Sequence, residues 1–181
     1  MINEILEHLR DEMQAGLIDN IPESDPARAG HVKIGPYQGD PTPEEGRITV
    51  SVHENDPDRI INGGVTGMRD EWSDEMDLIE CGGAATMTRR FTIKARCLFV
   101  KTGEKEDEAR RIASTVRRRI ETILKKMSFN GVQTSDEYVA RGVLANDLSG
   151  EMMQAGGPPD AFDYIIKVHF SVLTTQTGLL S

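Results

Sequence analysis

Two adjoining segments carry the clearest hydrophobic patterns of the chain. From 86 to 100, apolar and polar side chains alternate, as they do in a strand with one buried face. From 106 to 127, apolar residues recur every three or four positions, which predicts an amphipathic helix. Basic side chains cover the opposite face of that helix: Arg110, Arg111, Arg117, Arg118, Lys125 and Lys126.

Weaker patterns predict one more helix and three more strands. Apolar residues at helical spacing between Ile2 and Leu17 predict a helix that ends by about residue 20. Strands are predicted at 31–38, 47–55 and 161–175. Two stretches of weak pattern, at about 57–84 and 132–160, are interpreted as insertions in a single domain spanning 1–181.

These elements predict an α+β fold, a small mixed β-sheet of about four strands packed with two α-helices and interrupted by long loop insertions. The first three strands are expected to form an antiparallel meander. The last strand is expected to lie parallel to the strand before the long helix, after a right-handed crossover. A strand of about 15 residues spans about 50 Å, so we expect strand ends that project and pair with another chain.

The formal net charge of −9 is unevenly distributed. Residues 1–85 hold 6 basic and 19 acidic side chains, whereas residues 86–126 hold 13 basic and 5 acidic ones. The basic cluster has three open interpretations: a solvated helix face, a surface that meets acidic loops of a neighbouring subunit, or a phosphate-binding surface. The acidic balance of the whole chain and the lack of aromatic residues among the arginines weigh against nucleic acid.

The sequence has no arrangement typical of catalysis, of a cofactor or of a metal site. The four histidines fall in four different elements, and the two cysteines form no C-x-x-C pair. The densest candidate is His53, Glu54, Asp56 and Asp58, which we interpret as a solvated strand end and turn. Phosphate-loop and nucleophile motifs are also missing. We therefore expect no enzyme activity, no cofactor and no metal, and no apolar run is long enough for a membrane span.

An acidic stretch carries an apolar stripe at roughly helical spacing, formed by Met68, Trp72, Met76 and Ile79. This stripe either folds back on its own domain or contacts a neighbouring subunit. The residues that we expect at a subunit interface are Met68, Trp72, Arg110, Arg111, Arg117 and Arg118.

The order of the best-patterned segments is distinctive. It comprises the helix ILEHLRDEM, the strand RITVSVHENDP, the acidic insertion with EW, the strand RRFTIKARCLFV, the helix EARRIASTVRRRIETIL and the strand FDYIIKVHFSVLTT. In this organisation, which covers most of the chain, the protein resembles the tail terminator or tail-completion proteins of long-tailed bacteriophages. Both insertions are longer than the minimal domain of that family needs.

The resemblance implies a homohexameric ring of small α/β subunits in the neck of the virion, assembled in the host cytoplasm. The ring would bind the tail tube protein on one side and the head–tail connector proteins on the other. DNA would pass through the centre without specific binding, and the resemblance implies no catalysis, cofactor or membrane. The alternatives are a head-completion or minor tail protein of the same particle and a DNA-binding accessory protein.

Overall fold

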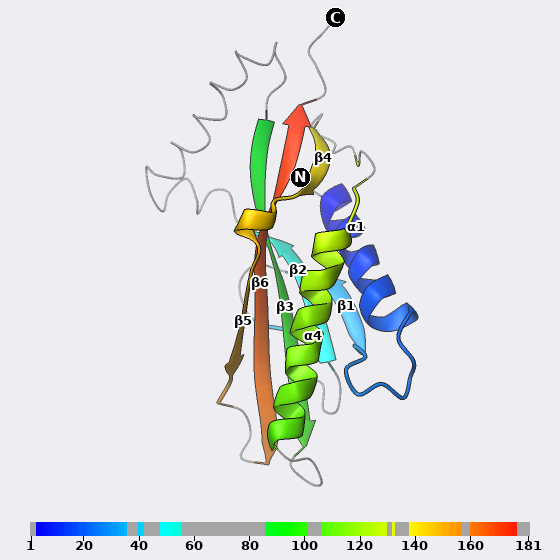
Figure 1. Cartoon of the computed structure of the whole chain (residues 1–181), viewed down its shortest axis with the longest axis vertical. Helices are drawn as coiled ribbons and strands as arrows, with labels where there is room; N and C mark the ends of the chain where they lie inside the picture. The colour runs from blue at the N-terminus through cyan, green and yellow to red at the C-terminus, as the bar shows by residue number, and fades with distance from the viewer. Residues whose placement is uncertain are drawn as a thin grey trace, which may run out of the picture.

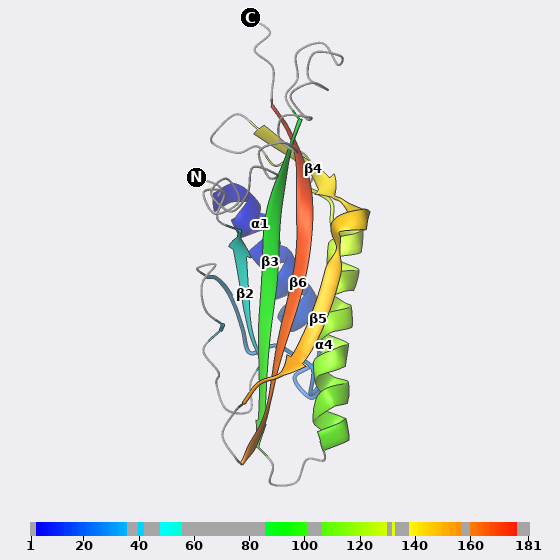
Figure 2. The same cartoon turned by 90° about the vertical axis from the view of Figure 1, so that its left-hand side faces the viewer.

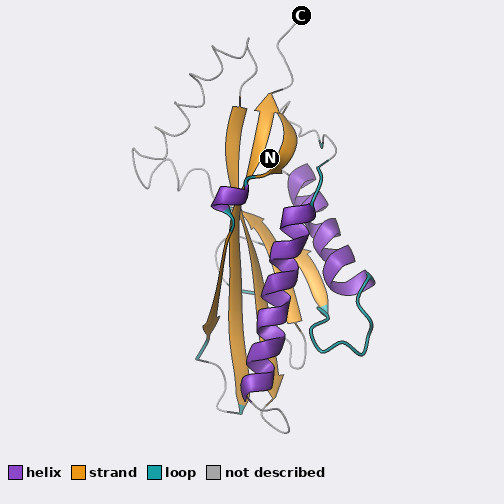
Figure 3. Cartoon of the chain, in the orientation of Figure 1, coloured by secondary structure: helices purple, strands orange, loops and turns teal. Residues whose placement is uncertain are grey.

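The computed structural model describes residues 3–35, 40–41, 48–55, 86–100, 106–129, 132, 138–156 and 160–176. In these residues, two helices pack on one face of a mixed β-sheet (Figure 1). The prediction of an α+β fold with a small mixed sheet and two helices is therefore confirmed. The sheet has six strands in the described residues, two more than the sequence predicts (Figure 3).

The helices are α1 (Asn3–Gln14), which continues into the π-helical turn η1 (Ala15–Asp19), and α4 (Glu106–Lys126). The strands are β1 (His31–Ile34), β2 (Ile48–Glu54), β3 (Thr86–Val100), β4 (Tyr138–Val143), β5 (Ser149–Gln154) and β6 (Ala161–Gln176). A short 3-10 turn, η2 (Ala145–Asp147), separates β4 from β5. The strand order is β1-β2-β3-β6-β4, and β5 pairs with β6 along the same edge as β4.

Two strand directions differ from the predicted topology. β1 and β2 are parallel instead of antiparallel, with His31 beside Thr49 and Ile34 beside Val52. The stretch of sequence between them, 35–47, is longer than the loop of a hairpin, by which neighbouring antiparallel strands are usually joined. β3 and β6 are antiparallel instead of parallel. The reason is that β4 and β5 lie between α4 and β6 in the chain and run back along the sheet, so that β6 begins beside the end of β3 (Figure 2).

The strands β4 and β5 lie inside the stretch 132–160, which the sequence predicts to be an insertion of weak pattern. Glycines interrupt both strands, at Gly142 and Gly150, and the register of β4 shifts between Ala140 and Gly142. β5 is exposed at every position except Met152, which is half-buried. Its side chains therefore do not show the alternation by which a half-buried strand is detected. The other expected insertion, at 57–84, lies outside the described residues.

A hydrophobic core fills the space between the sheet and the two helices. The alternating apolar residues of β3 lie opposite apolar residues of β6, with Phe91 beside Phe170 and Ile93 beside Val168. The predicted apolar faces of both helices pack on this layer. Their fully buried members are Ile5, Leu9, Met13, Ala109, Ala113, Val116, Ile120 and Leu124.

The central strands are long for so small a sheet. β3 has 15 residues and β6 has 16, and the two pair along the whole of β3. At one end they extend beyond both helices, where β4 pairs with β6 (Figure 1). The sheet therefore offers a surface that the two helices do not cover.

Candidate functional site

The outer face of α4 carries a line of exposed cations. Arg111, Arg118 and Lys125, spaced seven residues apart, lie on the same side of the helix and are exposed. We call these three residues the basic stripe. The stripe belongs to a rigid element, since the opposite face of α4 packs into the core through residues such as Val116 and Ile120.

The other predicted interface arginines lie on the flank of α4 or pair with neighbours. Arg110 lies 3.7 Å from Glu106, and Arg117 lies 3.6 Å from Glu121, each one helical turn away. Arg117 and Glu121 also lie against Gly150 of β5. The predicted arginine surface is therefore divided between the basic stripe and a flank beside β5. The other two predicted interface residues, Met68 and Trp72, lie outside the described residues.

Arg119, the third arginine of the run 117–119, faces the opposite flank and has a structural role. It donates hydrogen bonds to Asp25 Oδ2 at 2.6 Å and to the carbonyl oxygen of Ala27 at 3.1 Å. Arg28 donates to two carbonyl oxygens at and just after the end of η1. These bonds hold the segment between η1 and β1 beside α4. The hydrogen bond from Arg119 lowers the pKa of the Asp25 carboxyl.

A groove of about 530 Å³ lies between η1 and α4, next to the basic stripe. A Cβ atom at Gly16 would lie only 2.5 Å from Ile123 Cδ1, so the glycine allows η1 to approach α4 closely. Apolar residues beside cationic ones suit an acidic, partly apolar protein segment. The lining residues are Gly16, Ile21, Thr115, Arg118, Arg119, Thr122 and Ile123.

The sheet face opposite the helices is polar and largely buried. His53, Thr92 and His169 are register neighbours on β2, β3 and β6. The Thr92 hydroxyl donates to Asn55 Oδ1 at 2.8 Å, and His169 Nδ1, 2.8 Å away, must then donate to the same hydroxyl oxygen. Thr92 is 0% exposed, so this network joins strands rather than presenting a nucleophile.

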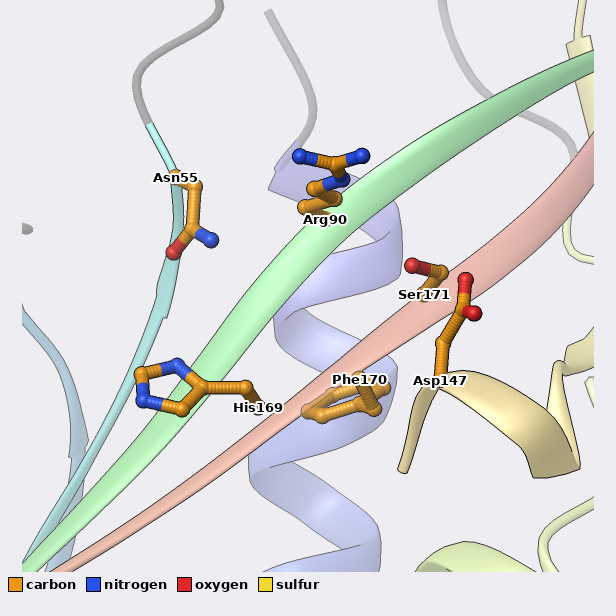
Figure 4. Close-up of a pocket in the computed structure, with 6 residues that line it drawn as sticks. All are labelled: Asn55, Arg90, Asp147, His169, Phe170 and Ser171. Carbon is orange, nitrogen blue, oxygen red and sulfur yellow. The ribbon is translucent and has the colours of Figure 1, made fainter. Parts of the chain in front are cut away.

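A pocket of about 260 Å³ adjoins this network (Figure 4). Its lining comes from β3, β6, η2 and the residue after β2. Within the described residues, no three His, Cys, Asp or Glu side chains gather closely enough to hold a metal ion. The lining residues are Asn55, Arg90, Asp147, His169, Phe170 and Ser171.

The interpretation of the segment 53–58 as a solvated strand end is wrong for His53, which is only 1% exposed. Its side chain belongs to the polar face of the sheet, where its neighbour on β3 is Thr92. Asp56 and Asp58 lie outside the described residues. The alternation of β2 identifies an apolar face, but it gives no sign that the polar face is buried as well.

Burial and the nearby charge of Lys94 lower the pKa of His53 to about 4. An unfolded histidine titrates near pH 6.5, so between these values the unfolded chain binds a proton that the folded chain does not. We expect stability to fall as the pH drops from about 6.5 to about 4, and to lose about 3 kcal/mol from this residue.

Urea unfolding between pH 7 and pH 4 tests this expectation. His53→Gln should flatten the pH dependence, and His31→Gln, at an exposed position on β1, is the control substitution. An identical pH dependence in the wild-type protein and in His53→Gln would show that His53 is not the titrating group.

No protein-family model matches this chain, and no curated protein matches it. In the part of the chain that the structure describes, no helix is long and apolar enough to cross a membrane. The function is therefore inferred from the chain's own features: the basic stripe, the neighbouring groove, the long central strands and the buried polar face.

Proposed function

We propose that this chain is a structural subunit of a homohexameric ring that terminates the tail tube of a long-tailed bacteriophage. The observation that carries the proposal is the segregation of charge, with an exposed basic stripe on a chain of net charge −9. In a ring of identical subunits, the same chain supplies both the cationic surface and the acidic surface that it meets.

The length of the central strands supports assembly. The ribbon of β3 and β6, which pair along 15 residues, extends beyond the helix layer at one end (Figure 1). Such a ribbon gives each subunit a surface for neighbours, and burial between subunits would add to a core of modest size.

In this proposal the ring joins the tail tube protein to the head–tail connector proteins in the virion. The DNA passes through its centre and is not bound there. An acidic lumen suits such passage, because DNA phosphates are repelled by carboxylates and held by exposed arginines. The basic stripe would accordingly face a protein neighbour rather than the lumen.

The ring is tested by multi-angle light scattering and negative-stain electron microscopy of the purified chain. We expect a mass near six times the 20.1 kDa subunit, and rings with an open centre. A monomeric mass at every concentration would overturn the proposal. So would retention of DNA at physiological salt through the basic stripe, because that result would favour a DNA-binding accessory protein.

Reversing the basic stripe should weaken the assembly. The triple variant Arg111→Glu, Arg118→Glu, Lys125→Glu places like charges against an acidic surface, and we expect subunit affinity to fall about tenfold or more. Arg117 and Arg119 are left unchanged because they contact Glu121 and Asp25 within the subunit.

The control is Arg90→Glu, which reverses an exposed cation of β3 on the sheet face away from both helices. Sedimentation velocity over a range of protein and salt concentrations measures the effect. An unchanged subunit affinity in the triple variant would exclude the basic stripe from the contact.

A further inference from the structure

The two edges of the sheet carry complementary features. Within the described residues, β1 pairs only with β2, and β5 pairs only with β6. The large hydrophobic side chains that the described residues expose are Ile34, at 39%, and Met153, at 43%. One lies on each edge strand, so both edges present apolar surface that the subunit itself does not cover.

The two edges lie too far apart to meet within one subunit, because β2, β3 and β6 separate β1 from β5. They can meet only between copies, in a head-to-tail contact of the kind that generates rings. The directions suit such a contact. β1 runs in the same direction as β6, and β5 runs opposite to β6, so β1 of a second copy would pair with β5 in the antiparallel sense.

The registers of the sheet place complementary side chains at the two edges. One row crosses the whole sheet from Lys33 on β1 to Glu151 on β5, through Ser51, Lys94 and Lys167. If the row continues into a second copy, Lys33 comes beside Glu151. Glu151 is 52% exposed in its side chain and lies 3.9 Å from His169 Nε2, so part of the carboxylate remains open to a partner.

The adjacent row ends in Ile34 on β1 and in Gly150 on β5. The exposed side chain of Ile34 would therefore lie beside a residue that has no side chain, next to Arg117 and Glu121, which lie against Gly150. The opposite charges of Lys33 and Glu151 at cross-strand positions favour pairing.

The backbone of β5 also offers free hydrogen-bonding positions on its outer side. The Ala155 amide donates to the Asp163 carbonyl oxygen at 2.8 Å, so odd-numbered residues of β5 direct their backbone groups toward β6. The amides and carbonyls of Gly150, Met152 and Gln154 therefore point away from β6, toward the open edge. A strand added there would use groups that the described strands do not use.

The helices above the two edges carry opposite charge. α4 lies over β5 and β6, whereas α1 lies over β1 and β2 on the same face. α1 holds four acidic side chains and one basic one, while α4 holds seven basic and four acidic ones. A contact between the β1 edge of one copy and the β5 edge of the next would bring acidic α1 toward basic α4.

We propose that the β1 edge of one copy adds to the β5 edge of the next, with Lys33 beside Glu151 and Ile34 beside Gly150. The contact is heterologous and continues the sheet from subunit to subunit. This contact would form the interface between neighbouring subunits of the ring. It rests on the proposed function only for the closure of the ring at six copies.

Disulfide trapping tests the contact. Two cysteine variants, Lys33→Cys and Glu151→Cys, are prepared, and in each of them the native Cys81 is replaced by serine. The two proteins are oxidised separately and as a mixture. The native Cys97 is buried, and burial raises the pKa of its thiol to about 12, so it does not compete. Within one subunit residues 33 and 151 are about 19 Å apart, four strand spacings, which no disulfide can bridge.

We expect linked heterodimer in the mixture to exceed linked homodimer in either protein alone by about tenfold or more. Predominant 33–33 or 151–151 linkage, or no linkage, would overturn the inference. Met153→Lys provides a second measurement, because a cation at this exposed edge position should lower the yield without unfolding the protein. An unchanged yield in that variant would also count against the contact.

The two proposals fail in different ways. A six-subunit ring without 33–151 linkage removes the edge contact and leaves the proposed function standing. Specific 33–151 linkage in open-ended chains, with no closed ring, supports the edge contact and overturns the ring.

Discussion

Replacing Arg96 with methionine is expected to destabilise the fold by about 3–5 kcal/mol. Arg96 donates from Nε and Nη2 to both carboxylate oxygens of Asp163, with a shortest distance of 2.6 Å. The Asp163 side chain is 0% exposed, whereas that of Arg96 is 22% exposed. Removing the guanidinium leaves a buried carboxylate without its cation, which is among the costliest single changes in a protein.

The two partners should not be equivalent. Asp163→Leu leaves the cation at Arg96, which is partly exposed and can still reach water, so we expect a smaller loss than in Arg96→Met. The double variant Arg96→Met, Asp163→Leu removes both charges and should recover much of the stability lost in Arg96→Met. Urea unfolding at neutral pH measures all three, and a loss below about 1 kcal/mol in Arg96→Met would contradict the role assigned to this pair.

Truncating Phe170 to alanine is expected to cost about 3–5 kcal/mol as well. The ring of Phe170 stacks on that of Phe91 with centroids 5.8 Å apart, and both residues are at most 2% exposed. They join β3 to β6 at the centre of the sheet. The loss combines removed apolar contact with the cavity left behind, and for a chain of this size it should lower the Tm by roughly 10 °C.

Two variants set the scale for Phe170→Ala. Phe170→Leu keeps most of the apolar volume and should cost markedly less. Asn146→Ala changes an exposed side chain of η2 and should alter stability by no more than about 0.5 kcal/mol. Calorimetry of the three variants would contradict the central position of Phe170 if its loss matched that of Asn146→Ala.

The sequence predicts the helices and the central strands well because their patterns arise from local geometry. The apolar faces of α1 and α4 repeat every three to four residues, and the helices bury those faces. The alternation along β3 and β6 likewise identifies the residues that pack under the helices, such as Ile93 and Val168.

The direction of the strands could not be predicted in the same way. It depends on which strands pair across long stretches of chain, and the two strands missed between α4 and β6 reversed the expected direction of β6. Those strands lie at the edge, contain glycines and bury few side chains, so their residues show little periodicity.

The candidate site could be predicted only in part. The basic face of α4 follows from helical periodicity, but periodicity does not show which arginines already have partners. Arg119 contacts Asp25, 94 residues away in the sequence, and only the fold brings the two together. The burial of Thr92 and His53 on the polar face also depends on the tertiary structure, since alternation alone predicts that this face is solvated.

The position of β6 in the sheet has a consequence for the order of folding during synthesis. β6 pairs with β3, β4 and β5, all of which precede it in the chain. Until residues 161–176 leave the ribosome, these three strands lack the partner that joins them. The start of β6 follows the start of β3 by about 75 residues, so β3 can pair only with β2 until then. We therefore expect β6 to pair late, after α1 and α4 have formed. Before that step, the unpaired edges of β3, β4 and β5 would be accessible to chaperones.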